Sequence, residues 1–177
     1  MNTIPEVMVM EELPTPRKAY AYGRGEYDAP MYEVFPATPE TVLSFPDSLP
    51  PNRLGLAQWL FDENNPLTAR VTVNRYWQML FGTGLVKTTQ DFGVQGELPS
   101  HPALLDWLAL QFMDSDWDVK QLLKTMVMSH TYQQDSKTSK ELLEKDPENR
   151  LLARVSSYRL PAEMIRDNAL VASGLIA

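Results

Sequence analysis

Three amide and guanidinium side chains form a polar stripe on one predicted helix. Arg70, Asn74 and Gln78 follow one another at intervals of four residues, which places them on one helical face. Apolar neighbours interrupt the stripe, so we expect it to be partly buried, and a buried arginine needs carboxylate or carbonyl partners. Such a stripe fits a clamp for an anion or a sugar. The commoner alternative is an internal ion pair of Arg70 with an acid, for which the chain offers Asp91, Asp106 and Asp167.

A polar loop, residues 87–102, is predicted between two strongly apolar helices. It contains Asp91, two glycines and, at the start of the next helix, His101. Loops on rigid scaffolds often carry function, and an imidazole there could act as a base or as a ligand. The favoured alternative is that the loop packs locally and that residues 100–102 only begin a helix, because caps of this kind are common.

A glycine-flanked turn is predicted at residues 23–28, where Arg24 and Asp28 lie. It is not a phosphate-binding loop, because it lacks the Gly-Lys-Ser/Thr ending and a following helix. A structural turn tied down by Arg24 is favoured.

The last predicted helix carries Glu163, Arg166 and Asp167 on its polar side and Asn168 within its apolar arc. Two carboxylates invite comparison with glycosidases, but these lie one turn apart on one helix, which disfavours catalysis. His130 is expected to be half-buried at the end of its own helix. The polar cluster proposed for ligand binding or for structure therefore consists of Arg24, Asp28, Arg70, Asn74, Arg75, Asp91, His101, Arg166 and Asp167.

Proline placement divides the chain that must position these residues. Ten of the 14 prolines lie at or before residue 66, and proline interrupts helices. We predict a mainly α fold: a proline-rich, partly extended N-terminal arm with short strands (1–52) and a compact helical body (53–177), together one domain. The predicted strands and helices cover 6–10, 18–22, 53–61, 66–81, 102–113, 119–129, 140–145 and 161–174.

Periodicity also predicts helix ends and faces. Asn65, Ser100 and Asp118 are the predicted N-caps of the second, third and fourth helices. The last helix is expected to turn an apolar face inward, made of Ile165, Ala169 and Ala172.

The composition excludes several classes of site. The chain has 177 residues, a net charge of -7, no cysteine and two histidines. Missing cysteine excludes thiolate metal sites, disulfides and the Cys-x-x-Cys-His attachment of haem, and we predict no metal site. The acidic balance argues against nucleic acid as a partner. No stretch reaches the roughly 18 apolar residues of a membrane span, and the N-terminus does not resemble a signal peptide.

A series of segments resembles an uncharacterised domain of large proteins that are abundant in planctomycetes and relatives, including some Bacteroidetes. This family is catalogued as a domain of unknown function. The segments are 24–28, 52–60, 65–78, 81–86, 91–93, 96–102, 105–108, 117–120, 149–154 and 159–167.

The resemblance implies an exported, multidomain parent protein at the periplasm or cell surface, often with a cytochrome-c-like domain. It implies no catalytic residues. Where the family usually has an arginine, this chain has Gln133. The family's domain usually continues past the position of Ala177, so the chain is expected to be a fragment. Haem would then belong to other domains of the parent.

We therefore expect an accessory or interaction module that packs against neighbouring domains and aids binding of a polysaccharide or other extracellular ligand. The alternative is a hydrolase or lyase acting on polysaccharide, whose cleft would gather Arg70, Asn74, Asp91 and His101. Convergence of these four side chains on one open pocket separates the two hypotheses.

Overall fold

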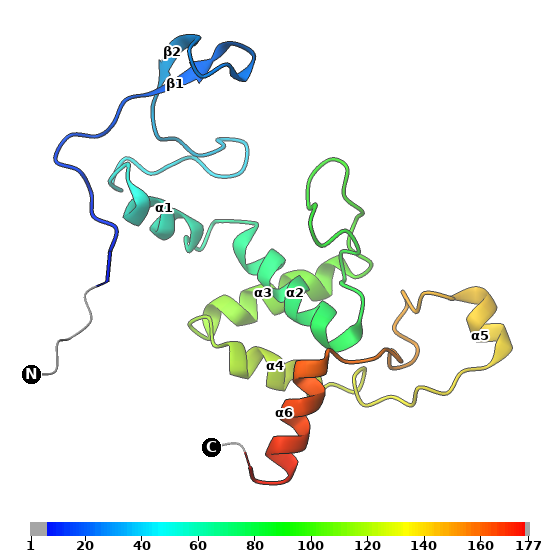
Figure 1. Cartoon of the computed structure of the whole chain (residues 1–177). Coiled ribbons are helices and arrows are strands. Elements are labelled where there is room, and N and C mark those ends of the chain that lie inside the picture. Colours follow the sequence, from blue (N-terminus) through cyan, green and yellow to red (C-terminus); the bar gives the residue numbers. More distant parts are fainter. Residues whose placement is uncertain (1–6, 176–177) are drawn as a thin grey trace, which may run out of the picture. The chain divides into compact units, whose positions relative to one another are not determined.

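The computed structural model describes residues 7–175, and this part of the chain is mainly helical. It contains six α-helices and one two-stranded sheet near the N-terminus, which confirms the predicted class. The chain divides into two compact units, Met1–Trp59 and Leu60–Ala177, which are described separately here (Figure 1).

The first unit contains a β-hairpin. Strand β1 (Ala19–Tyr22) pairs antiparallel with β2 (Pro30–Val34). The intervening 3-10 turn, η1 (Gly23–Gly25), needs positive φ at two residues, 52° at Arg24 and 78° at Gly25. Glycine adopts such values without strain. The strand and its break are as expected, whereas β2 was not predicted.

One predicted strand, residues 6–10, does not form. The structure describes 7–10, which are irregular and exposed; Glu6 lies outside the described residues. An isolated apolar run becomes a strand only when another strand satisfies its backbone groups, and the hairpin pairs β1 with β2 alone.

Helix α1 (Arg53–Leu60) is held against the coil that precedes it. Asn52 Oδ1 accepts a hydrogen bond from the Gly55 amide at 3.0 Å, and the Trp59 indole donates to the Leu43 carbonyl at 3.1 Å. A Cβ atom on Gly55 would lie 1.9 Å from the Pro50 carbonyl oxygen. Glycine at this position therefore permits the close approach of helix and coil.

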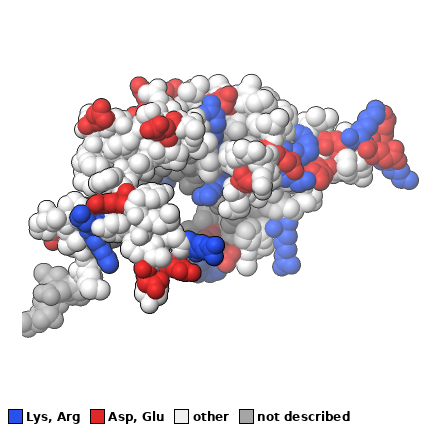
Figure 2. Space-filling model, turned by 90° about the horizontal axis from the view of Figure 1, so that it is seen from above, with Lys and Arg blue, Asp and Glu red and all other residues white. Residues whose placement is uncertain are grey.

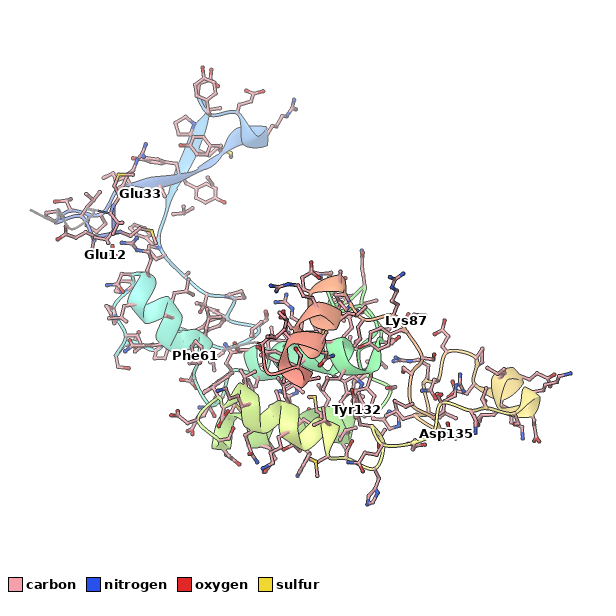
Figure 3. All side chains as sticks on the ribbon, turned by 60° about the horizontal axis from the view of Figure 1, so that its bottom comes forward. Glu12, Glu33, Phe61, Lys87, Tyr132 and Asp135 are labelled. Atoms are coloured by element: carbon pink, nitrogen blue, oxygen red, sulfur yellow. The ribbon has the colours of Figure 1, made fainter. Side chains whose placement is uncertain are left out.

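The second unit has its core between three helices: α2 (Thr68–Phe81), α3 (Pro102–Asp114) and α4 (Val119–Val127). Each fully buried aliphatic or aromatic side chain in such a core contributes about 1.5–3 kcal/mol. Tyr132 meets Phe81 edge to face at 5.5 Å, and Phe61 meets Trp117 at 4.7 Å (Figure 3). The buried core consists of Val73, Trp77, Phe81, Leu85, Val86, Leu105, Leu108, Phe112, Leu122 and Met126.

One of the three predicted N-caps, Asp118, is at its expected position. Asn65 Oδ1 accepts from the amides of Leu67 and Thr68, at 3.0 and 3.3 Å, but it is not the N-cap, because α2 begins at Thr68 with Leu67 in the N-cap position. Asp118 Oδ1 accepts from the Gln121 amide at 3.0 Å.

The predicted cap at Ser100 is wrong. His101 occupies the N-cap position of α3, without a side-chain cap, while Pro102 is its first residue. The Ser100 amide instead donates to the Leu85 carbonyl at 2.9 Å. The Ser100 backbone thus connects the chain just before α3 to Leu85, in the segment that follows α2.

The last two helices lie outside the core. Helix α5 (Lys140–Lys145) begins as predicted, with Ser139 Oγ accepting from the Leu142 amide at 3.1 Å. Helix α6 (Ala162–Ala172) has no buried residue, so its predicted inward face is exposed, as are Asn168 and His130. Helical periodicity identifies an apolar face, but burial also requires a packing partner; His130, moreover, lies beyond the end of α4.

Within residues 7–175, no helix is long and apolar enough to cross a membrane.

Candidate functional site

Arg70 is engaged in an ion pair. Its Nε donates to Asp106 Oδ1 at 2.6 Å, and its Nη1 donates to the Pro66 carbonyl at 2.6 Å. Asp106 is one of the three acids that the sequence offers as a partner. The ion pair of Arg70 therefore joins α2 to α3, and its guanidinium already has a carboxylate partner within the protein.

Asn74 is completely buried, with an exposed fraction of 0%. Its side-chain amide exchanges two hydrogen bonds of 2.9 Å with the backbone N–H and carbonyl of Val86. A Cβ atom on Gly84 would lie 2.7 Å from Asn74 Nδ2. Asn74 therefore acts as a backbone partner for the turn after α2, and glycine at 84 makes the approach possible.

Asp91 and His101 make local contacts at opposite ends of the polar loop. Asp91 Oδ1 accepts from the Gly93 amide at 2.7 Å, and His101 Nδ1 lies 3.1 Å from Ser100 Oγ. The Thr88 hydroxyl closes the loop: it donates to the Asp91 carbonyl at 2.8 Å and accepts from the Glu97 amide at 2.9 Å. These contacts correspond to the favoured alternative, in which the loop packs locally.

The four residues of the hypothetical catalytic cleft do not line a common pocket among the described pockets. Arg70 lines one with Asp106, whereas Asn74, Asp91 and His101 line none of those described. Arg70 thus belongs to an ion pair and Asn74 to a buried bridge with the Val86 backbone. The side chains of Asp91 and His101 make their contacts within the loop.

The remaining members of the predicted cluster are exposed. The side chains of Arg24, Asp28 and Arg75 make no hydrogen bond or ion pair within residues 7–175. Backbone bonds such as Glu26 N–H to the Gly23 carbonyl hold the turn at 23–28. Arg166 and Asp167 pair with each other at 3.2 Å on α6. On the face seen in Figure 2, basic and acidic side chains are interspersed.

Sequence reasoning missed a polar pocket of about 400 Å³ in the second unit. We call it the Arg154 pocket. It is formed by the end of α2, the coil before α5 and the segment that follows α5. Its polar lining consists of Thr83, Ser136, Thr138, Glu148, Asn149, Arg154, Ser156, Ser157 and Tyr158.

The turn at residues 146–154 supports this pocket through bonds from charged side chains to backbone. The buried Asp146 carboxylate accepts from the amides of Arg150 and Leu151, at 2.7 and 2.8 Å. Arg150 reaches back to the turn after α2 and donates to the carbonyls of Gly84 and Leu85, each at 2.9 Å. Asp146 can be buried in this otherwise charged segment because the backbone of its own turn supplies the carboxylate with partners.

Arg154 lines the pocket but is largely buried, with an exposed fraction of 9%. Its Nη2 donates to the carbonyls of Asp146 and Pro147, each at 3.1 Å. Its Nη1 is buried and makes no hydrogen bond within residues 7–175. Asn149 Oδ1 is also buried without a partner, although its Nδ2 donates to the Arg154 carbonyl at 2.8 Å.

A surface ion pair borders the pocket. Lys87 (Figure 3) donates a hydrogen bond from Nζ to Glu148 Oε2 at 2.8 Å. The hydrogen bond and the charge of Lys87 lower the pKa of Glu148, and the same two interactions with Glu148 raise the pKa of Lys87. At the opposite wall, burial raises the pKa of Tyr158, whose hydroxyl donates to the Met79 carbonyl.

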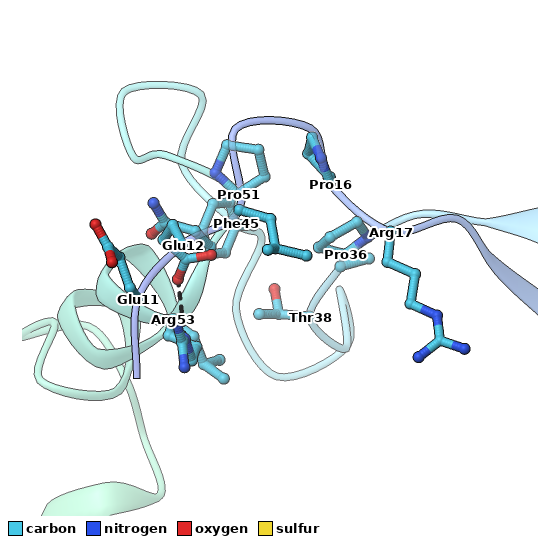
Figure 4. Close-up of a pocket in the computed structure, with 13 residues that line it drawn as sticks. Glu11, Glu12, Pro16, Arg17, Pro36, Thr38, Phe45, Pro51 and Arg53 are labelled. Carbon is cyan, nitrogen blue, oxygen red and sulfur yellow. Dashed lines mark hydrogen bonds and ion pairs between the residues drawn. The ribbon is translucent and has the colours of Figure 1, made fainter. Parts of the chain in front are cut away.

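The first unit has a larger cavity, of about 610 Å³ (Figure 4). Its walls are mainly apolar and include Leu13, Pro36 and Phe45. Its ionic contact is the pair between Arg53 Nε and Glu12 Oε1, at 2.9 Å. Within residues 7–175, the buried side-chain polar atoms without a hydrogen bond belong to Asn149 and Arg154, and neither residue lines this cavity.

Comparison with known proteins gives a family but no activity. A family model described as PSD1, protein of unknown function (DUF1553), matches residues 52–177. The matched range includes α1 to α6 and the whole Arg154 pocket, and it excludes the hairpin. No curated protein and no solved structure matches the chain.

Proposed function

Since this chain belongs to the family of unknown function described as PSD1 (DUF1553), we propose its role from its geometry: it is a non-catalytic binding module that holds a polysaccharide chain in the Arg154 pocket. The observation that carries the proposal is the lining of this pocket. Hydroxyl groups of serine, threonine and tyrosine surround a buried guanidinium and an amide. Sugars are recognised through many hydroxyl groups, which need donors and acceptors in alternation.

The contacts of the predicted polar cluster support a binding role over a catalytic one. Arg70 and Asn74 are both committed to structural partners. Within residues 7–175 no group of His, Cys, Asp or Glu could hold a metal ion. A polysaccharide-binding function needs neither a nucleophile nor an acid–base pair.

We place this module in an exported protein of the periplasm or cell surface, packed beside neighbouring domains, with haem carried by other domains of the parent. The support is the resemblance of the segments given above. Within this chain the absence of cysteine leaves no Cys-x-x-Cys-His attachment site.

A glycan array followed by titration calorimetry on the full chain tests the binding function. We expect at least one oligosaccharide to bind. Thr138→Val combined with Ser156→Ala should weaken binding by about thirtyfold, because each of the two lost hydrogen bonds contributes about 1 kcal/mol. Ser173→Ala, at the C-cap of α6 and not part of the pocket lining, is the matched control. An array without binding, or equal affinity in the double variant, contradicts the proposed function.

A further inference from the structure

The Arg154 guanidinium is a buried positive charge without a nearby carboxylate. A guanidinium stays protonated in proteins and has five N–H donors. Within residues 7–175 no acid lies within 4.0 Å of it, and two carbonyls occupy only Nη2. Buried charges are costly unless they are paired. An anion in the pocket would supply the missing partner.

The acids around the pocket are already neutralised by other groups. The Asp146 carboxylate is held by two amides of its own turn. Glu148 is paired with Lys87. Arg154 itself pairs with neither acid within residues 7–175. An incoming anion would therefore not have to displace a carboxylate from Arg154.

The second unpartnered atom at the pocket, Asn149 Oδ1, is a hydrogen-bond acceptor, whereas Arg154 Nη1 is a donor. Asn149 Nδ2 donates to a carbonyl, which fixes the side-chain amide so that Oδ1 is the free atom. A carbonyl oxygen accepts hydrogen bonds and cannot donate them. A complementary ligand must therefore present an anionic acceptor to Arg154 and a hydroxyl donor to Asn149.

The sugar that combines these groups is a uronic acid, which carries a carboxylate and hydroxyls on one ring. We propose that the Arg154 pocket selects a uronate residue of an acidic polysaccharide, with its carboxylate on Arg154 Nη1 and a ring hydroxyl on Asn149 Oδ1. This inference rests on the proposed polysaccharide-binding function. Charge selects the acidic sugar, and the surrounding hydroxyl groups bind the rest of the chain.

Entry of the uronate requires part of the pocket wall to move. Both unpartnered atoms are buried, although their residues belong to the pocket lining. Ser136 and Thr138 belong to the wall, and residues 135–141 are exposed throughout. Helix α5, which follows, has no buried residue. Segments with few buried contacts open at low free-energy cost, so this side of the pocket is the entrance.

Calorimetry with a matched pair of ligands tests the inference on the unaltered full chain. The probes are trigalacturonate and the same trimer with its carboxyl groups methyl-esterified. The free acid should bind about tenfold or more tightly than the ester, and added salt should reduce this preference. Equal binding of the two overturns the uronate inference but leaves the binding function intact. Binding of neither, together with an empty array, contradicts both.

A variant then assigns the preference to one residue. Arg154→Met should abolish the difference between acid and ester, whereas Arg159→Met, an exposed arginine close by, should preserve it. Retained preference in Arg154→Met overturns the assignment. A sulfated trisaccharide separates carboxylate from other anions: tighter binding of the sulfated sugar than of trigalacturonate overturns the choice of uronate. The ligand pair on the unaltered chain decides the matter even if the variant does not fold.

Discussion

The three-helix core and the turn at residues 146–154 lie in the same unit but are stabilised by different forces. Helices α2, α3 and α4 bury apolar side chains against one another. The turn instead directs Asp146, Arg150 and Arg154 to backbone amides and carbonyls. Apolar side chains packed against one another have no free hydrogen-bond donor or acceptor to offer a ligand. Charged side chains in a turn can retain a spare donor, so binding is expected there rather than in the core.

The largest effect should come from the core. Leu108, with an exposed fraction of 2%, packs within it. Leu108→Ala should lower the free energy of unfolding by about 2–5 kcal/mol, through lost burial and the cavity left behind. Denaturant unfolding of the full chain measures this. Leu110→Ala, at a half-exposed position on the same helix, should have a much smaller effect. Similar losses at both positions would contradict the placement of the core.

The bridge from Asn74 on α2 to the core residue Val86 should be nearly as sensitive. Asn74→Ala leaves the buried N–H and carbonyl of Val86 without their partner. We expect a loss of about 2–4 kcal/mol, because each unsatisfied buried group costs about 1–3 kcal/mol. Arg75→Ala, one residue further along α2 and exposed, is the control. Hydrogen exchange at the Val86 amide should accelerate with Asn74→Ala; unchanged protection would refute the bridge.

The turn itself should respond less. Arg150→Met removes the two charge-assisted bonds to the Gly84 and Leu85 carbonyls. The expected loss of unfolding free energy is about 1–3 kcal/mol, because the Leu85 carbonyl keeps its bond from the Ser100 amide and only the Gly84 carbonyl loses the partner supplied by Arg150. Thermal unfolding of this variant beside Arg159→Met checks the value. A loss equal to that of Leu108→Ala would remove the distinction between core and turn.

The smallest effect should be the pH dependence of the Lys87–Glu148 pair, which is exposed to solvent. Lys87 lowers the pKa of Glu148 from its ordinary value of 4.5. A carboxylate with a lowered pKa stabilises the fold above its unfolded pKa, and this contribution disappears as the pH falls through the folded pKa.

Comparing the unaltered chain with Glu148→Gln tests this sign. The small difference in unfolding free energy should be present at pH 7, vanish in acid and shrink in high salt. Glu144→Gln, on α5, provides the exposed control. A difference that grows toward acid pH would reverse the assignment.

The helices of the core were predictable because their signals are local. Asp118 caps α4, and Asn65 binds the backbone just before and at the start of α2, through atoms two or three residues away; apolar periodicity identifies the buried faces of α2 to α4. The family was also recognisable from its segments. Asp106 was one of the three acids predicted as possible partners of Arg70, but which of them forms the ion pair depends on how α2 and α3 pack.

The Arg154 pocket could not be predicted from local patterns. Its cation, amide and hydroxyl groups come together only when the chain after α5 returns to the end of α2. The spacing of Asp146, Arg150 and Arg154 is regular, yet these residues lie in a turn rather than on a helix face. The failure at α6 has the same origin: whether an apolar face is buried depends on a distant partner.

The loop after α2 is closed at a neck, where Thr88 joins the two strands of chain that lead to the loop tip. The length of the tip can therefore change with little effect on the stability of the helical body. Thr88 binds both sides of the neck, and a Cβ atom on Gly96 would lie 2.2 Å from the Asp91 carbonyl oxygen. Beyond this neck Val94 is fully exposed. Inserted residues at the tip would extend only a segment whose ends are already joined, and the entropy of closing a loop grows slowly with its length. Evolution can therefore vary this tip, or a short peptide tag can be placed there, without disturbing α2 and α3.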